Sequence, residues 1–126
     1  MTSPHPLSPT QAEALADRFR LLSEPTRLRL IDLLEEGEAS VGTLTERLGC
    51  TQANVSKHLA LLADAGVLHR RREGLHCFYS VADSSALQIR DAGWDWVCRQ
   101  RRAAADELAA SASAYIRPRS ASTSAT

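Results

Sequence analysis

Two clusters of polar residues in this sequence have the side-chain types and the spacing needed to bind a ligand. Six polar residues lie between positions 51 and 58, and three consecutive arginines follow at positions 70–72. Glutamine and asparagine can bond adenine through two hydrogen bonds, while serine, threonine, lysine and arginine suit bases or phosphates. The two clusters therefore predict a surface that contacts double-stranded DNA. The candidate contact residues are Thr51, Gln52, Asn54, Ser56, Lys57, His58, Arg70, Arg71 and Arg72.

Two short helices must position the first cluster. The sequence predicts helices over residues 40–49 and 51–66, joined by a turn around Cys50. Apolar residues recur at helical spacing in the second helix and leave its polar residues, His58 included, on the outward side. The stripe expected to face inward is Val55, Leu59 and Leu62. This is a helix-turn-helix arrangement, whose second helix enters the DNA major groove.

Two further helices precede this pair. Ser8, with Gln11 three residues later, forms a capping box that starts a helix running to about residue 22. Ser23 is expected to cap a second helix that ends at Gly37. The residues expected to be buried on these two helices are Ala12, Leu15, Phe19, Leu22, Leu28, Ile31 and Leu34.

The pattern changes after Gly66. Residues 67–72 and 76–81 are rich in strand formers and flank a turn with Gly74, which predicts a β-hairpin. A long helix follows from residue 83 or 85. The fold class expected is mainly α with a small β-hairpin: a winged helix-turn-helix of four helices, two strands and a last helix. Residues 1–7 are expected to be a disordered arm, residues 8–116 the domain and residues 117–126 a disordered tail.

The amino-acid composition excludes several classes of protein. The chain has 126 residues, of which 44% are hydrophobic and 24% charged, as expected for one folded domain. No apolar run approaches the roughly 18 residues of a membrane span, and no signal peptide is evident. Three cysteines at irregular spacing indicate reduced thiols in a cytoplasmic protein. No nucleophile–base pair or glycine-rich phosphate loop is present, so we do not expect an enzyme.

The net charge of zero conceals an uneven distribution. Residues 1–49 carry five basic and eight acidic groups, a net charge of −3. Residues 50–82 carry four basic and two acidic groups, a net +2, and residues 83–126 a net +1. The positive balance begins where the DNA-facing elements are expected, so overall neutrality does not argue against a nucleic-acid partner.

Several linked motifs resemble the ArsR-type winged-helix transcriptional regulators, over roughly residues 12–98. The similar segments are SEPTRLRL at 23–30, TQANVSKHL at 51–59, LLADAGVL at 61–68 and RREGLHCFYS at 71–80. Leu75 departs from the pattern, because the family commonly has a basic residue there. The resemblance implies a cytoplasmic homodimer, held by its first and last helices, that binds a palindromic operator and is released by an inducer.

The predicted last helix carries more apolar surface than a small core can absorb, which independently suggests dimerisation. The alternative is that this helix packs only within its own chain. The expected dimer-interface residues are Leu15, Phe19, Leu87, Trp94, Val97 and Leu108.

The inducer is left open between a metal ion and a thiol-reactive signal. No histidine lies in the last helix and no cysteine in the helices around 41–48 and 51–66, so the family's usual metal sites cannot be built. We therefore predict no metal site and no certain cofactor. The candidate sensor thiols are Cys50, beside the second helix of the pair, and Cys98, in the last helix; the alternative is that both are unreactive.

The sequence thus predicts a sequence-specific DNA-binding transcriptional regulator, with repression favoured over activation. The alternative is a winged-helix protein-interaction module that binds no DNA. A module of that kind would have little reason to keep both the polar helix face and the wing arginines.

Overall fold

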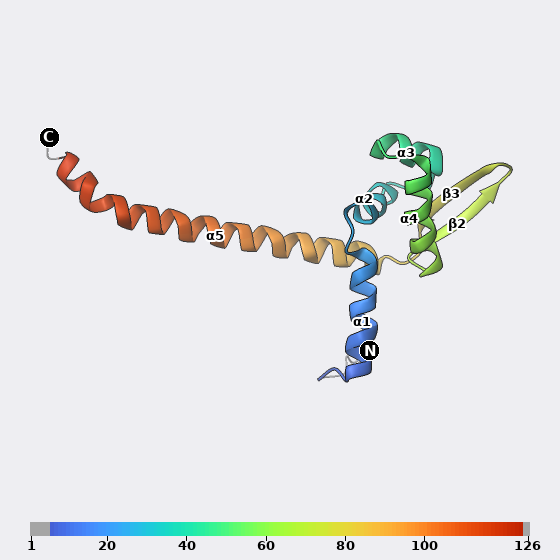
Figure 1. Cartoon of the computed structure of the whole chain (residues 1–126), viewed down its shortest axis with the longest axis horizontal. Coiled ribbons are helices and arrows are strands. Elements are labelled where there is room, and N and C mark those ends of the chain that lie inside the picture. The colour runs from blue at the N-terminus through green and yellow to red at the C-terminus, as the bar shows by residue number, and fades with distance from the viewer. Residues whose placement is uncertain (1–5, 125–126) are drawn as a thin grey trace. The chain divides into compact units, whose positions relative to one another are not determined.

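The computed structural model describes residues 6–124, with side chains described as far as residue 113. The chain divides into two compact units, residues 1–88 and residues 89–126. The elements, coloured along the chain in Figure 1, are α1 (Pro9–Leu22), α2 (Pro25–Leu34), β1 (Ala39–Ser40), α3 (Val41–Leu48), α4 (Gln52–Asp64), β2 (Leu68–Glu73), β3 (His76–Val81) and α5 (Ser85–Ser124). No helix in the described part is long and apolar enough to cross a membrane.

Local signals set most of the helix starts. Ser8 and Gln11 form the predicted capping box at α1. The side chains of Ser40 and Thr51 cap α3 and α4 by accepting backbone N–H groups. Gly49, at φ 70°, ends α3 in the left-handed region, where a side chain would be strained.

The cap expected for α2 is wrong. Ser23 is the C-cap of α1, and Glu24 is the N-cap of α2. The Glu24 carboxylate accepts a hydrogen bond of 2.7 Å from the Thr26 backbone N–H. A glutamate can take this role because its longer side chain folds back onto the first turn, where Pro25 has no N–H to offer.

The wing, defined here as residues 68–81, is the predicted hairpin with a third strand added. The sheet order is β1-β3-β2, and all pairings are antiparallel. The short strand β1 pairs Ala39 with Tyr79 and Ser40 with Phe78, which joins the wing to the start of α3. Sequence reasoning missed β1 because two residues show no alternation.

The core lies among α2, α3, α4 and the base of the wing. The largest fully buried side chains are Leu30, Ile31, Leu44, Val55, Leu59 and Leu62. The stripe predicted for α4 is confirmed, but Leu28 is exposed and Leu30 takes the buried place expected for it. Leu30, Ile31 and Leu34 share one side of α2, whereas Leu28 lies at its flank.

Most of the predicted stripe of α1 is not buried within the chain. Leu22 is buried, but Leu15 and Phe19 are 42% and 49% exposed. Periodicity identified the apolar side of α1 and not what covers it.

The expected boundaries at the two chain ends stay predictions. Residues 1–5 of the expected arm lie outside the described residues. The helix α5 extends past the predicted boundary at residue 117 as far as Ser124. Pro118 removes one backbone N–H donor and can kink a helix without ending it.

Candidate nucleic-acid interface

In its amino-terminal half, the helix α4 has polar residues on one side. Its apolar residues lie on the other side. We define the outward face of α4 as Gln52, Ala53, Ser56 and Lys57. Gln52, Ala53 and Lys57 are exposed, and Ser56 is partly buried. The Thr51 hydroxyl accepts the Asn54 N–H at 3.2 Å, and its own hydrogen remains available as a donor. This face offers amide, hydroxyl and ammonium groups together at the positive end of a helix dipole.

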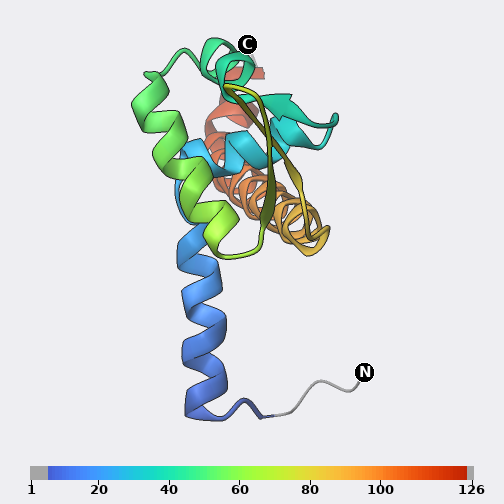
Figure 2. The same cartoon turned by 90° about the vertical axis from the view of Figure 1, so that its right-hand side faces the viewer.

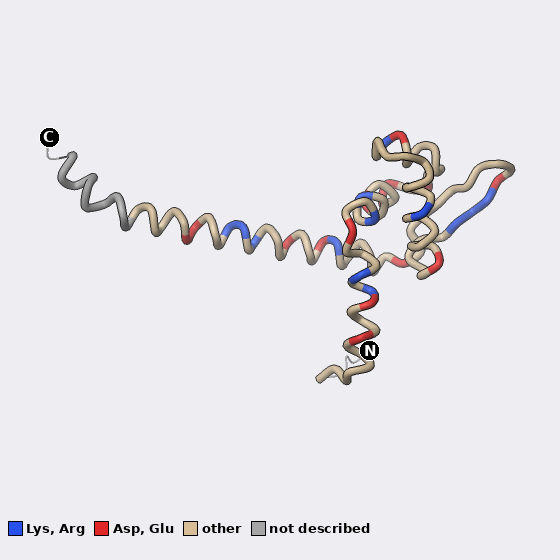
Figure 3. The backbone as a smooth tube through the Cα atoms, in the orientation of Figure 1, with Lys and Arg blue, Asp and Glu red and all other residues tan. Residues whose placement is uncertain are grey.

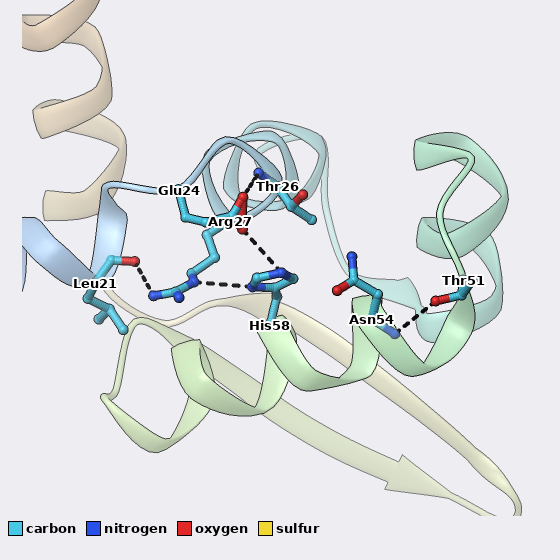
Figure 4. A network of polar contacts seen from close by, with 7 residues as sticks. All are labelled: Leu21, Glu24, Thr26, Arg27, Thr51, Asn54 and His58. Carbon is cyan, nitrogen blue, oxygen red and sulfur yellow. Dashed lines mark hydrogen bonds and ion pairs between the residues drawn. The ribbon is translucent and has the colours of Figure 1, made fainter.

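His58 does not belong to the outward face, so its expected exposure is wrong. Its residue exposure is 8%, and it lies on the side of α4 that faces α2. Arg27 Nε donates to its Nδ1 at 3.2 Å, and its Nε2 lies 3.1 Å from Glu24 Oε2 (Figure 4). The outward placement failed because position 58 follows Val55 by three residues and precedes Leu62 by four, which puts it on the buried stripe.

Asn54 lies one turn before His58 and points to the same side of the helix (Figure 4). It is partly buried, unlike its exposed neighbours Gln52 and Ala53. Asn54 therefore lies at the edge of the exposed polar surface of α4, and its base contact stays a prediction.

The three wing arginines are exposed and lie together along β2, where they form a continuous basic stretch (Figure 3). Side chains alternate along a strand, so Arg70 and Arg72 share one face and Arg71 lies on the other. A hydrogen bond with the Tyr79 side chain raises the pKa of Arg70.

Arg71 is bound by the protein itself. Its guanidinium donates to both carboxylate oxygens of Glu38, at 3.0 and 2.8 Å, and to Glu73 at 2.5 Å. Its Cζ also lies 4.7 Å from the centre of the Phe78 ring. The hydrogen bonds with the two carboxylates raise the pKa of Arg71, and the bond from Arg71 lowers the pKa of Glu38. Sequence reasoning assigned Arg71 to DNA and missed its ties to Glu38 and Glu73.

The elements that carry the two clusters lie side by side. Figures 1 and 2 show α4 next to the hairpin, and Leu68 at the start of β2 is buried in the same core as Leu59 and Leu62 of α4. The outward face and the basic strand are thus fixed to one core.

The predicted dimer residues fall into two groups. Leu87 is partly buried and packs against the chain's own core. The remaining five have large exposed apolar side chains: Leu15, Phe19, Trp94, Val97 and Leu108.

The three cysteines are all free thiols and partly buried. Cys50 Sγ lies 3.8 Å from the Leu48 carbonyl oxygen, in the turn before α4. Among the described residues, no three histidine, cysteine, aspartate or glutamate side chains gather as a metal site would require.

Comparison with known proteins identifies the family. Residues 22–71 match the model of a helix-turn-helix domain. The chain is 34% identical over 94 residues to a biofilm growth-associated repressor of Xylella fastidiosa, covering 75% of this chain and 82% of the relative. It is 37% identical over 101 residues to a probable mercury resistance operon repressor of Streptomyces lividans, covering 80% and 75%.

The chain belongs to the ArsR-type family of winged helix-turn-helix transcriptional regulators. The crystal structure of Rv0081 from Mycobacterium tuberculosis superposes on this ArsR-type regulator with a TM-score of 0.67 and 30% identity, covering 76% of this chain and 96% of that one. The predictions of a winged helix-turn-helix fold, of a DNA-binding transcriptional regulator and of a protein that is not an enzyme are confirmed.

Proposed function

We propose that this ArsR-type regulator is a cytoplasmic homodimeric repressor. The outward face of α4 reads the bases of a palindromic operator, and the wing contacts the phosphate backbone of the DNA. The observation that carries the proposal is the exposed polar face of α4, mounted on the same core as the basic strand β2. Gln52 and Ser56 suit base edges, and Lys57, Arg70 and Arg72 suit phosphates.

A second copy is part of the proposal for two reasons. One recognition helix reads only a few base pairs, and two helices about 34 Å apart on one DNA face reach useful specificity. The apolar side chains of α1 and α5 are exposed in the single chain, with Trp94 at 59% and Leu108 at 71%. A second copy that covers these side chains would remove them from water.

Selection of DNA from a random-sequence library by the purified wild-type protein tests this function. We expect a two-fold symmetric duplex to be enriched and to bind less tightly as salt rises. Gln52→Ala should relax the preference at one position in each half-site and cost about 1–3 kcal/mol of binding free energy. Gln88→Ala, an exposed glutamine in α5, is the matched control and should change nothing. If no duplex is enriched, the protein-interaction module is the better description.

We also propose that any thiol-dependent release from the operator runs through Cys50 or Cys98. Cys50 adjoins the start of α4, and Cys98 lies one turn after Trp94 on α5. A variant with all three cysteines replaced by serine should bind the operator and no longer respond to hydrogen peroxide or to metal ions. Cys77→Ser alone is the control and should respond as the wild type does. If the triple variant is released normally, the thiols have no sensing role.

A further inference from the structure

A partly buried polar cluster on the inward side of α4 has no part in the DNA contacts proposed above. We call Glu24, Arg27 and His58 the clasp. Arg27 Nε donates to His58 Nδ1 at 3.2 Å, and His58 Nε2 lies 3.1 Å from Glu24 Oε2. The other Glu24 oxygen accepts the Thr26 N–H at the start of α2 (Figure 4). The clasp thus links the middle of the recognition helix to the beginning of α2.

The geometry fixes the tautomer of His58. Nδ1 accepts the Arg27 N–H, so it carries no proton, and Nε2 lies 3.1 Å from Glu24 Oε2, a buried oxygen that accepts no hydrogen bond from the described residues. The imidazole therefore lies between the Arg27 guanidinium, which donates to Nδ1, and the Glu24 carboxylate, whose Oε2 lies close to Nε2. An apolar side chain at this position would leave Arg27 Nε without its acceptor and Glu24 Oε2 without its only polar neighbour on α4 among the described residues.

The clasp also reaches the carboxyl end of α1. Arg27 Nη1 donates to the Leu21 carbonyl oxygen at 2.9 Å. A separate bond joins α1 to the end of α4, because Arg18 Nη1 of α1 donates to the Ala65 carbonyl oxygen at 2.8 Å. Ala65 is the C-cap of α4, where a cation is favoured by the helix dipole. The helix α4 is therefore held to α1 and α2 near its middle and at its end.

We propose that Glu24, Arg27 and His58 are positioning residues for DNA recognition, which hold α4 at the orientation its outward face needs to enter the major groove. This inference rests on the proposed DNA-binding function. The outward and inward faces belong to one rigid helix, so a rotation allowed by loss of the clasp would displace Gln52 and Lys57 together. The expected effect is a uniform loss of affinity, without a change in which bases are preferred.

Three substitutions at His58 separate its hydrogen bond with Arg27 from its contact with Glu24. His58→Asn keeps an acceptor near the place of Nδ1, His58→Gln keeps a donor near the place of Nε2, and His58→Leu removes both. Affinity for the duplex selected by the wild type should fall about tenfold in His58→Leu and less in the other two. Base preference and the slope of affinity against salt should stay as in the wild type, because no phosphate or base contact is lost.

Two controls distinguish positioning from direct contact and from mere stability. Lys57→Ala, on the outward face, should reduce the salt slope by about one unit. Ile31→Val destabilises the buried core of α2 without changing a residue of the clasp, and it should leave affinity unchanged at a temperature where it is fully folded. A changed salt slope or base preference in His58→Leu would overturn the proposal, and so would an unchanged affinity.

Two measurements that need no DNA separate this inference from the proposed function. Nitrogen NMR of the wild type should find His58 protonated at Nε2 and not at Nδ1. Amide hydrogen exchange in His58→Leu should accelerate in α4 more than in α3. If the wild type enriches no duplex, the proposed function fails, and the clasp has no role in recognition. If the duplex is enriched but α3 and α4 accelerate equally, only the clasp is overturned.

Discussion

Apolar side chains are buried in the winged-helix core but largely exposed on the helices α1 and α5. Leu30, Leu59 and Leu62 are fully buried by other parts of the same chain. Phe19 of α1 and Trp94 of α5 belong to apolar stripes with the same helical spacing. They are nevertheless 49% and 59% exposed. Periodicity therefore identifies a face that must leave water without indicating whether the chain itself or a second copy covers it. The chain therefore buries the apolar side chains around α4 by itself and leaves exposed the surfaces that we expect to pair.

The largest effect should come from the core side of this comparison. Leu59→Ala removes a fully buried side chain of α4 and should lower the free energy of unfolding by about 2–5 kcal/mol. Leu61→Ala, two positions along the same helix, truncates an exposed leucine and should cost much less. Chemical denaturation of both variants at one protein concentration measures the difference. Equal losses would mean that burial in the single chain does not describe the folded protein.

The opposite side of the comparison predicts a loss of pairing. Trp94→Ala should raise the dimer dissociation constant about 30-fold, the equivalent of about 2 kcal/mol for a central aromatic contact. Trp96→Ala is the matched control, because Trp96 is equally exposed on α5 but lies away from the face of Trp94, Val97 and Leu108. Sedimentation equilibrium over a range of concentrations measures both. If Trp96→Ala weakens the dimer as much, the assigned face of α5 is wrong.

The same comparison explains what the sequence could and could not predict. Caps and glycines are local signals, so Ser8, Ser40, Thr51 and Gly49 marked their helix ends correctly. The core stripe of α4 was equally readable because three residues repeat at helical spacing. Partners distant in the sequence left no such signal: Glu38 meets Arg71 across 33 positions, and Arg27 meets His58 across 31. A polar residue type suggests a contact with DNA, but only the fold shows whether another side chain has already bonded it.

Two adjacent arginines of the wing repeat the contrast on a smaller scale. Arg71 is paired with two carboxylates, whereas Arg72 forms no ion pair with the described residues. Arg72→Ala should reduce the slope of log affinity against log salt by about one unit, the effect of one lost phosphate contact. Arg71→Ala should reduce it less, because the Arg71 charge is already opposed within the wing. Fluorescence anisotropy of the selected duplex over a salt series measures both, and a larger change for Arg71→Ala would reverse their assigned roles.

The smallest effect concerns the partner of Arg71. The hydrogen bond from Arg71 lowers the pKa of Glu38 below its usual value, so the folded state favours the ionised carboxylate. Its contribution to stability is therefore present above the ordinary glutamate pKa and is lost as pH falls through the lowered value. Glu38→Gln should reduce the thermal midpoint by a few degrees at most near neutral pH, since the pair is partly exposed. The wild-type and variant midpoints should converge in acid, because Glu38 is then protonated and both side chains are neutral. A difference that persists unchanged at low pH would show that Glu38 stabilises the wing by packing and not by its charge.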